Sequence, residues 1–599
     1  MIREELINRY RELVDINEHL LVKQKKKMFF ISMSRLAVFV AGILAAAKAF
    51  SISGIAGIAI LLIFAALFLL LVKQFTGMSE KIRFTENLLS INRSEINAFK
   101  GDYSAFNGGD IWKDKDHDFS NDIDLFGDDS IFRYLNRTVT GYGREILACW
   151  LTDPYLLRNQ IKPRQDAVNE LAENLSWRQE FMANGLGKPL EKEDIESLGK
   201  WLEGKEKYLS SPLLKTVVII SPVLTTGILI LTLTGLVPYE FAVLLFLLNL
   251  LLTGIYLTRS NRVHSMVSRK YIFLSSFEKL IAAFGNERFR SDILADIRAR
   301  LHSGAASAEM RINQLSSIIR AFDSRLNLFA GFILNGLILW DFQCLLRLER
   351  WKHGSSGQLP LWLGAIGEAD ALISLANHAF NNPAFVFPEI SDGMPVFEAV
   401  DMGHPLIDEK TRICNDFSIE HKGLIYIITG ANMAGKSTFL RTVAVNLILA
   451  MAGTKVCAAK FRFMPVVIFS SMRTTDSLSS NESYFYAELK RLKILKDRFD
   501  SDPDLFFILD EILKGTNSLD KSTGSKMFLG KIAEKNGTGI VATHDISLGE
   551  MEKVYPRNIL NKCFEVEIDG ESVVFDYKIR DGITKHMNAG LLMKQMGIV

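Results

Sequence analysis

Residues 424–438 read LIYIITGANMAGKST, and this stretch decides the fold of the C-terminal part of the chain. The apolar run Leu424–Ile428 predicts a buried parallel strand that ends in a glycine-rich turn. The turn fits the pattern G-x-x-x-x-G-K-[ST], whose fixed positions are Gly430, Gly435, Lys436 and Ser437. Such a turn curls backbone N–H groups around phosphates, and its glycines let the backbone approach the anion closely. The stretch therefore predicts a nucleotide site, with a glycine turn in an unrelated α/β domain as the alternative.

The helix that follows the turn completes the expected site. It begins near Lys436 and continues through the helical run Phe439–Ala450, so that its N-terminal dipole points at the phosphates. Lys436 supplies a cation for the β- and γ-phosphates, and the Ser437 hydroxyl ligates Mg²⁺. The loop residues predicted to bind ATP are Gly430, Ala431, Met433, Ala434, Gly435, Lys436, Ser437 and Thr438.

Two further strands end in residues suited to phosphate chemistry. The segment Asp504–Glu511, DLFFILDE, is an apolar strand that ends in two carboxylates. Asp510 would hold the Mg²⁺ shell, and Glu511 would polarise the attacking water as general base. The segment Thr538–His544, TGIVATH, is the next strand, and its histidine can reach a γ-phosphate or the water. The alternative for Asp510 and Glu511 is that they only cap the next turn, and the alternative for His544 is a structural role.

A polar loop lies between these elements. Thr474–Lys490 reads TTDSLSSNESYFYAELK, a Ser/Asn-rich loop that feeds a helix. Ser480 or Ser483 could cap that helix. The other interpretation is that the loop completes the ATP site of a neighbouring subunit, and residue types alone leave both open.

Composition sets bounds on the whole chain. At 599 residues, several domains are expected. A hydrophobic fraction of 48% and a mean hydropathy of +0.14 are high for a soluble protein. The net charge of +2 gives no global basic field for nucleic acid. Five cysteines without CxxC spacing argue against a disulfide scaffold or a zinc site and fit a reducing compartment. No cleavable signal peptide is expected.

Four apolar runs predict two transmembrane hairpins. Met28–Phe50 is interrupted by Arg35 and Lys48, whereas Ile52–Val72 is uncharged and long enough to cross ~30 Å of hydrocarbon. Downstream, Thr216–Val237 is uncharged and Tyr239–Leu257 carries only Glu240. Basic residues flank the outer ends of both hairpins, which predicts cytoplasmic termini and an inner-membrane location. The alternative is buried core helices. A shorter run, Leu328–Trp340, is expected to be a core or interfacial helix.

The remaining chain is expected to be mainly helical up to an α/β domain. Helices are predicted from Asp122 onward and over Arg262–Leu301, Ala308–Ile333 and Asp370–Phe380, and alternating strands and helices begin near Ala399. The predicted architecture is an α/β P-loop (ABC-type) ATPase domain preceded by an all-α core and lever domain, with two transmembrane hairpins. Its segments are an N-terminal cytoplasmic helix (1–27), hairpin 1 (28–74), a linker (75–121), the first part of the core (122–212), hairpin 2 (213–258), the second core and lever part (259–398) and the ATPase domain (399–599).

Several motifs in one order resemble the MutS family of DNA mismatch-repair ATPases, which belong to the ABC type. They are GANMAGKST, SLSSNESYFYAEL, FFILDEILKGTNSLDKSTG and VATHD. Upstream, DIDLF, LNRTVTGYGREIL, IKPRQDAVNEL and the segments ISLA, FVFPEI and EAVDMGHPLI resemble the family's core and lever. The C-terminal YKIRDGITKHMNAGLLMKQMGI resembles the end of its ATPase domain. The likeness covers the chain from Asp122 onward, interrupted by the second hairpin.

The resemblance implies further roles and partners. It implies that Asn432 lies in the phosphate loop, that Ser483 and Ser480 contact the partner subunit's nucleotide, and that His544 is the switch histidine. It also implies a homodimer with composite ATP sites. The chain departs from the family pattern in three places: the first hairpin replaces the mismatch-reading domain, the second replaces the DNA clamp, and the C-terminal helix-turn-helix is not found. ATP chemistry is therefore expected to carry over, whereas mismatch recognition is not.

Three functions remain open at this stage. The first is a membrane-anchored MutS-like ATPase that passes nucleotide-driven motion through its lever helices to the hairpins and to a membrane or protein partner. The second keeps DNA as ligand, with phosphate contacts from Arg288 and Arg290 or from Arg298 and Arg300. The third is an ABC-type transporter, against which the spans carry few polar residues besides Asn249 and Glu240.

Overall fold

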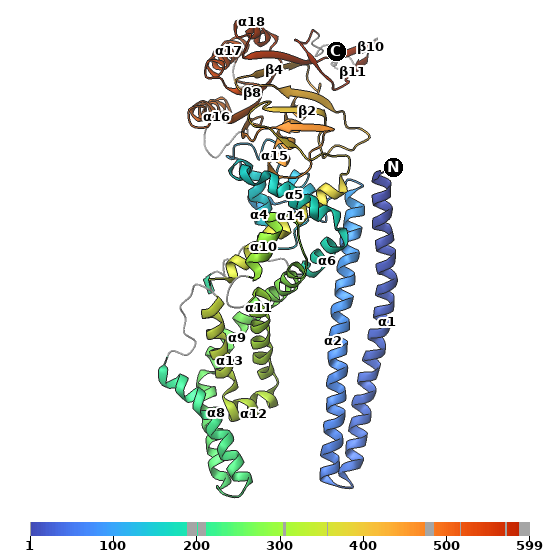
Figure 1. Ribbon diagram of the computed structural model, residues 1–599, viewed down its shortest axis with the longest axis vertical. Coiled ribbons are helices and arrows are strands. Elements are labelled where there is room, and N and C mark those ends of the chain that lie inside the picture. The colour runs from blue at the N-terminus through green and yellow to red at the C-terminus, as the bar shows by residue number, and fades with distance from the viewer. Residues whose placement is uncertain are drawn as a thin grey trace.

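The fold comes from a computed structural model that describes residues 2–187, 200–201, 211–302, 307–355, 357–473, 484–514, 517–569 and 572–585. Three parts lie one below another in Figure 1: a part built on strands, a helical core, and two helical legs that point the same way. The N-terminus lies beside the core, at the upper end of the first leg.

The strand-containing part is organised around a six-stranded sheet in the order β12-β9-β4-β8-β7-β6. Neighbours from β9 to β6 pair in parallel, and β12 pairs antiparallel at one edge. The central strands are continuous apolar runs because both faces of a parallel sheet are covered. The strands are β4 (Ile425–Gly430), β6 (Val467–Ser471), β7 (Leu505–Asp510), β8 (Thr538–Thr543), β9 (Ile559–Phe564) and β12 (Ile579–Asp581).

Helices and a second sheet enclose the first. Helix α15 (Lys436–Ala452) is buried on nearly all sides because it lies between the six-stranded sheet and the helical core; near its start, the Phe439 ring lies 5.1 Å from that of Phe417 in β3. The second sheet has the order β1-β5-β2-β3, with β1 (Glu389–Ile390), β2 (Phe397–Met402), β3 (Asn415–Ile419) and β5 (Lys460–Phe463). The remaining elements are α16 (Tyr484–Arg498), α17 (Ser518–Glu534), α18 (Met551–Val554), β10 (Glu567–Asp569) and β11 (Ser572–Val574).

The helical core is built around α14 (Leu359–Asn381), which is buried over most of its length. Asp370 of α14 accepts hydrogen bonds from the backbone of Val139 and Thr140 and from the Thr140 hydroxyl, at 2.6–3.1 Å. These bonds fix the start of α4 against α14. The other core helices are α3 (Ile131–Leu135), α4 (Gly141–Thr152), α5 (Ile161–Glu173), α6 (Leu175–Gly185), α10 (Asp292–His302), α11 (Ala308–Asp323) and α13 (Trp340–Ser355).

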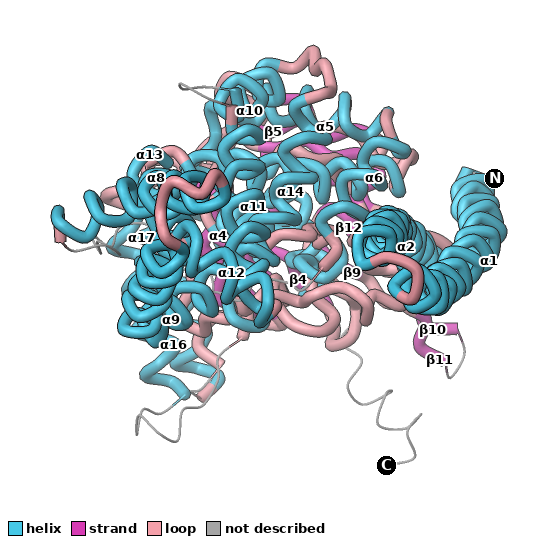
Figure 2. The backbone as a smooth tube through the Cα atoms, turned by 90° about the horizontal axis from the view of Figure 1, so that it is seen from below, coloured by secondary structure: helices cyan, strands magenta, loops and turns pink. Residues whose placement is uncertain are grey.

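The two legs stand apart, as Figure 2 shows from below. The first is the helical hairpin α1 (Ile2–Phe50) and α2 (Gly54–Ala98). The second contains α8 (Pro212–Leu233), the long α9 (Tyr239–Gly285) and the short α12 (Leu328–Ile338). Arg35 is one of the two charges that interrupt the first apolar run, and its guanidinium lies 4.7 Å from the ring of Phe75, just beyond the uncharged run of α2.

Five described helices are long and apolar enough to cross a membrane by length and composition, or six if the bent pair α12–α13 counts as one span. They are α1, α2, α8, α9 and α14. In α14, 78% of the apolar window is buried, against 6–17% in the other four. The apolar surface of α14 therefore belongs to the core, and the other four expose theirs.

Several predicted helix boundaries are wrong, each for a tertiary reason. The helix expected over Arg262–Leu301 breaks after Gly285, because the Glu170 carboxylate accepts from the backbone N–H groups of Arg290 and Ser291 at 2.7 and 2.8 Å. The helix expected over Ala308–Ile333 breaks at Ser324–Asn327. No helix break separates residues 27 and 28, since α1 is continuous.

The chain from Asp122 is also not helical until Ile131. The Asp122 carboxylate instead accepts from the Ser470 hydroxyl and from the backbone N–H groups of Met472 and Arg473, at 2.6–3.1 Å. These side-chain-to-backbone bonds replace helical ones and fasten the loop to the edge strand β6.

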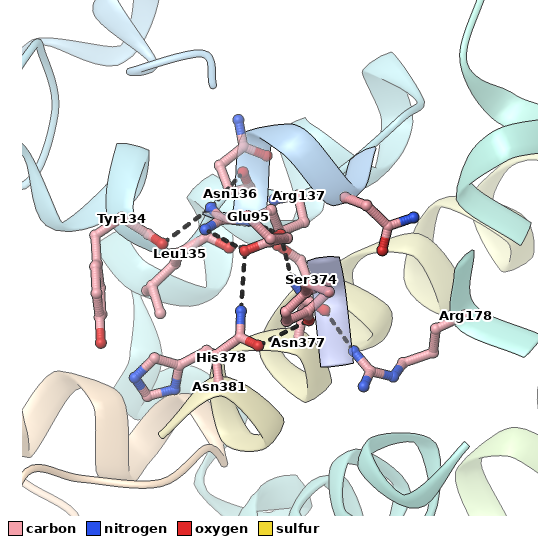
Figure 3. Close-up of polar contacts among 12 residues, drawn as sticks. Glu95, Tyr134, Leu135, Asn136, Arg137, Arg178, Ser374, Asn377, His378 and Asn381 are labelled. Carbon is pink, nitrogen blue, oxygen red and sulfur yellow. Dashed lines mark hydrogen bonds and ion pairs between the residues drawn. The ribbon is translucent and has the colours of Figure 1, made fainter. Parts of the chain in front are cut away.

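A buried polar cluster joins the first leg to the core (Figure 3). Glu95 of α2 accepts from Arg137 Nε at 2.6 Å, from Asn377 Nδ2 at 2.7 Å and from Asn381 Nδ2 at 2.9 Å. Arg178 donates to the Asn377 side-chain oxygen at 2.6 Å. The end of α2 is thereby held to the last turns of α14.

Candidate functional site

The carboxyl ends of three neighbouring strands bring the predicted residues together. Strand β4 leads into the loop 430–438, β7 ends at Asp510 and is followed by Glu511, and β8 is followed by His544. Because the strands are parallel and adjacent, their carboxyl ends share one edge, where ligands bind in open α/β sheets.

The loop after β4 has the backbone of an anion-binding turn. Met433 and Gly435 have φ of 65° and 97°, and Gly435 is the N-cap of α15. A Cβ on Gly430 would lie 2.9 Å from the carbonyl oxygen of Phe564, so the start of the loop tolerates only glycine. The first N–H groups of α15 have no acceptor within the helix, and its dipole favours an anion here.

Lys436 lies inside this loop and is 6% exposed. Its Nζ donates to the carbonyl oxygens of Gly430 and Ala431, both at 2.8 Å. Burial lowers the pKa of Lys436 to about 8, an effect that Asp510 and Glu511 oppose. A phosphate entering the loop would provide the charge partner that the ammonium lacks.

Two oxygen ligands for a divalent cation meet beside the lysine. The Ser437 hydroxyl donates to Asp510 Oδ2 at 2.5 Å, which joins the start of α15 to the end of β7. Hydroxyl and carboxylate oxygens suit Mg²⁺, which is usually held by one or two protein ligands together with phosphate and water. Among the described residues, no group of three or more His, Cys, Asp or Glu side chains is placed to hold a metal alone.

Glu511 and His544 face each other across the opening. Glu511 Oε1 lies 3.3 Å from His544 Nε2, and Glu511 Oε2 lies 3.6 Å from Nζ of Lys521. His544 Nδ1 lies 2.8 Å from the Gly430 carbonyl oxygen. Burial, and then the charge of Lys436, lowers the pKa of His544. A neutral imidazole beside a carboxylate can orient a water molecule and exchange a proton with it.

The backbone at Glu511 is unusual. Glu511 and Leu513 adopt φ of 58° and 61°, a region that side chains other than glycine rarely occupy. The Leu513 N–H donates to Glu488 Oε1 at 2.6 Å, and Glu488 of α16 is buried. Glu488 therefore holds the turn that aims Glu511 into the site, a role that the sequence analysis missed.

A cavity of about 640 Å³ contains the predicted residues Asn432 to Thr438, Asp510, Glu511 and His544. Other residues that line the cavity were missed: Met402, His404, Asn415, Phe564 and Tyr577. Asn415 accepts from the Ile579 N–H and donates to the Tyr577 carbonyl, at 2.9 and 3.0 Å. Motif spacing could not find these residues because they come from distant parts of the chain. Three of them stand in segments quoted for the resemblance: Met402 and His404 in EAVDMGHPLI, and Tyr577 at the start of YKIRDGIT. Ser480 and Ser483 lie outside the described residues.

Comparison with known proteins agrees with this arrangement. The model of MutS domain V matches residues 426–598, and the model of MutS domain III matches residues 116–215. These two matches support membership of the MutS family. The domain V match contains all the residues of the predicted site, and the domain III match contains the loop that Asp122 fastens to β6.

Individual MutS proteins are similar to different lengths of the chain. The DNA mismatch repair protein MutS of Fusobacterium nucleatum is 33% identical over 235 residues, 36% of this chain and 26% of that protein. That of Persephonella marina is 24% identical over 526 residues, 79% of this chain and 57% of that protein. Human MutS protein homolog 4 is 30% identical over 234 residues, 37% of this chain and 24% of that protein. The chain spans only 24–57% of the length of these relatives.

Proposed function

We propose that this protein is a membrane-anchored, MutS-like ATPase that binds and hydrolyses ATP with Mg²⁺. The observation that carries the proposal is the convergence of Lys436, Ser437, Asp510, Glu511 and His544 on one cavity at the carboxyl edge of three adjacent parallel strands. Helix α15 and its loop would bind the β- and γ-phosphates, and the wall around Tyr577 would receive the base.

The roles of the charged residues follow from their positions. Lys436 would leave the carbonyl oxygens of its own loop and pair with phosphate oxygens. Ser437 and Asp510 would hold Mg²⁺, which neutralises phosphate charge when bound. Glu511 would orient the attacking water and accept its proton, and His544, 3.3 Å away, would hold the Glu511 carboxylate in place.

A homodimer is part of the proposal. The loop with Ser480 and Ser483 follows β6, immediately beyond the described Arg473, and would complete the site of the other subunit. ATP would then bring two ATPase domains together.

The motion would reach the membrane through α14. Helix α15 begins at the site and ends at Gly453, against the core. There the Thr454 hydroxyl lies 3.1 Å from His378 Nδ1 of α14, and Arg164 of α5 donates to the Ala452 carbonyl at 3.1 Å. Spin labels on the two ATPase domains should approach each other when ATP is added; unchanged distances would contradict this mechanism.

Membrane anchoring by α1–α2 and α8–α9 is supported by exposed apolar side chains. Ile55 and Leu62 of α2 and Val223 of α8 are 64–83% exposed. Such surfaces are costly in water and favourable in lipid. We infer an inner-membrane protein with its ATPase domain in the cytoplasm, since the basic residues flank the outer ends of both hairpins.

The first test is ATP hydrolysis by the detergent-purified protein, with and without matched and mismatched duplex DNA at low salt. Lys436→Ala should abolish hydrolysis, and Lys553→Ala, an exposed lysine of α18, should not. Activity that persists in Lys436→Ala would overturn the proposal. If DNA changes the rate of ATP hydrolysis, the enzyme depends on DNA and the hairpins serve as tethers. If DNA leaves the rate unchanged, a membrane or protein partner is favoured.

The structure weakens two alternatives. Among the arginines considered for DNA, Arg300 pairs with Asp296 and Glu368 and Arg298 donates to the Gly285 carbonyl, whereas Arg288 is exposed and Arg290, 83% exposed, has a surface pair with Glu173. For a transporter, polar groups should line a path, but Asn249 bonds to Ser221, Thr225 and the Gly336 carbonyl within the second leg. These described groups satisfy one another's hydrogen bonds inside the second leg.

A further inference from the structure

Helix α12, the short helix of the second leg, carries an exposed apolar face at its N-terminal half. Leu328 and Phe329 are 86% and 83% exposed, and Phe332 and Ile333 are 54% and 50% exposed. These residues stand at i, i+1, i+4 and i+5, so they share one side of the helix. Water is an unfavourable environment for this surface.

Further along the helix, the same side of α12 packs against α9, since Leu328, Phe332 and Gly336 stand at i, i+4 and i+8. Phe332 meets the ring of Phe246 in α9 at 5.3 Å, and a Cβ on Gly336 would collide with the same ring. Asn249 Nδ2 donates to the Gly336 carbonyl at 2.9 Å. Asn249 lies ten residues before Arg259, or about 15 Å along α9. The end of α12 therefore lies at the depth of the uncharged stretch of α9.

Both ends of α12 have the caps that an apolar surrounding demands. The Asn327 side chain accepts from the N–H groups of Phe329 and Ala330 at 3.1 and 3.2 Å. At the other end, Leu339 adopts φ of 51° and donates to the Asn335 carbonyl, beside the capped Gly336. Backbone groups in hydrocarbon must be paired within the protein, and these bonds pair groups at both ends of α12.

The neighbouring helix cannot continue α12 across a membrane. Helix α13 meets α12 at 78° and carries Asp341, Arg347, Glu349 and Lys352. Asp341 is buried in an ion pair with Arg325 at 2.9 Å and accepts from the Ser260 hydroxyl at 3.0 Å. The chain thus enters the apolar layer at α12 and leaves it through α13 on the side from which it came.

We propose that α12 is a third membrane contact, a capped helix that lies in the cytoplasmic leaflet with its Leu328–Phe329–Phe332–Ile333 face against phospholipid acyl chains. The proposal rests on the proposed insertion of the α8–α9 hairpin, against which α12 packs. Since α12 joins α11 to α13, the core would touch the bilayer directly as well as through its hairpins.

Photo-crosslinking tests this contact. The benzophenone amino acid p-benzoylphenylalanine is placed at Phe329 in the full chain, reconstituted in nanodiscs of phosphatidylcholine and phosphatidylglycerol. Two reference positions are Phe241 on α9, 55% exposed, and Ile111 in the core, 72% exposed. Because Phe329 is a surface residue, the replacement should leave the fold intact, which unchanged gel filtration and ATP hydrolysis would check.

Intact-mass measurement after irradiation distinguishes the outcomes. We expect a one-phospholipid adduct at Phe329 and Phe241 and none at Ile111. Adducts at Phe241 without adducts at Phe329 would overturn the α12 contact while leaving hairpin insertion standing. A crosslink from Phe329 to a second copy of the chain would also overturn it, by assigning the face to a protein interface. Lipid adducts at neither Phe329 nor Phe241 would overturn membrane insertion of the second leg together with the α12 contact.

Discussion

Replacing Glu95 by glutamine should detach the first leg from the core. Four donors converge on this buried carboxylate: Nε and a terminal nitrogen of Arg137, at 2.6 and 3.2 Å, and the side-chain nitrogens of Asn377 and Asn381 (Figure 3). A glutamine offers one acceptor oxygen, and its amide nitrogen would face donors. The Arg137 guanidinium would also lose its counter-charge.

The expected cost is large because both partners are buried. Removing one member of a buried ion pair costs about 3–5 kcal/mol, whereas exposed pairs contribute roughly 0–1 kcal/mol. At about 1.4 kcal/mol per tenfold change, local opening of this junction should become roughly 100- to 4,000-fold more frequent. Glu86→Gln is the matched control, since Glu86 lies on the same helix and pairs with Lys25 at 2.8 Å on the surface.

Hydrogen–deuterium exchange of the detergent-solubilised protein measures this opening. Peptides that cover the end of α2, residues 131–140 and the end of α14 should exchange faster in Glu95→Gln, and those of the β4–β8 sheet should not. The double variant Glu95→Met with Arg137→Met should recover part of the protection, since it leaves no uncompensated charge. Exchange in Glu95→Gln equal to that in Glu86→Gln would refute the reasoning.

Three further predictions follow from buried polar groups. Because the pKa of Lys436 is lowered to about 8 and phosphate favours its charged form, ATP affinity should fall as the pH rises past 8; calorimetric titration showing a constant affinity from pH 7 to 9.5 would contradict this. Burial lowers the pKa of His378 to about 3, so below pH 6.5 the unfolded chain binds a proton that the folded one lacks, and stability should fall with acidification. Asp370, whose pKa burial raises to about 6, has the opposite effect on stability between pH 6 and 3.8, so the contribution of His378 has to be measured as a difference from a variant. As the pH falls from 7 to 4.5, thermal melts should show His378→Gln becoming more stable relative to the parent protein. A difference in stability that stays constant over this range would contradict the prediction. Asn249→Leu removes the hydrogen bond to the Gly336 carbonyl and should lower stability in nanodiscs by roughly 1 kcal/mol. Leu248→Ile, on the exposed side of the same helix, is the control, and an equal loss of stability in this control would contradict the prediction.

The sequence predicts the part of the site that is made of the glycine-rich turn and of the residues at the ends of strands. A glycine-rich turn after an apolar strand, and acids or a histidine at the ends of later strands, must meet if the strands are parallel and adjacent. Neither the wall around Asn415 and Tyr577 nor the Glu488 bond to the turn after Glu511 follows such a rule. Their positions depend on how β3 and β12 fold over α15 and on where α16 docks, which are long-range contacts.

Composition was a weaker guide to the helices. Both α14 and α2 are long and apolar enough to cross a membrane, with hydropathies of 1.3 and 3.2 in their most apolar stretches, but only the apolar stretch of α14 is mostly buried. The breaks after Gly285 and Asp323 were missed because their causes, the Glu170 carboxylate and the Asp341 ion pair, lie far away in the sequence. The turn connections of both hairpins were predictable, since there the apolar runs end at short polar or proline-containing segments.

The position of α14 explains how one nucleotide site could act on two separate legs. Asp370 on α14 holds the start of α4, Asn377 and Asn381 hold Glu95 at the end of α2, and His378 contacts Thr454 at the end of α15. The N-terminal end of α14 follows α13, which descends to α12. A close-packed, buried helix transmits displacement because its neighbours cannot deform independently. A movement of α15 on ATP binding would therefore be shared between the legs, and cutting the Glu95 contact should uncouple the first leg while leaving the second responsive.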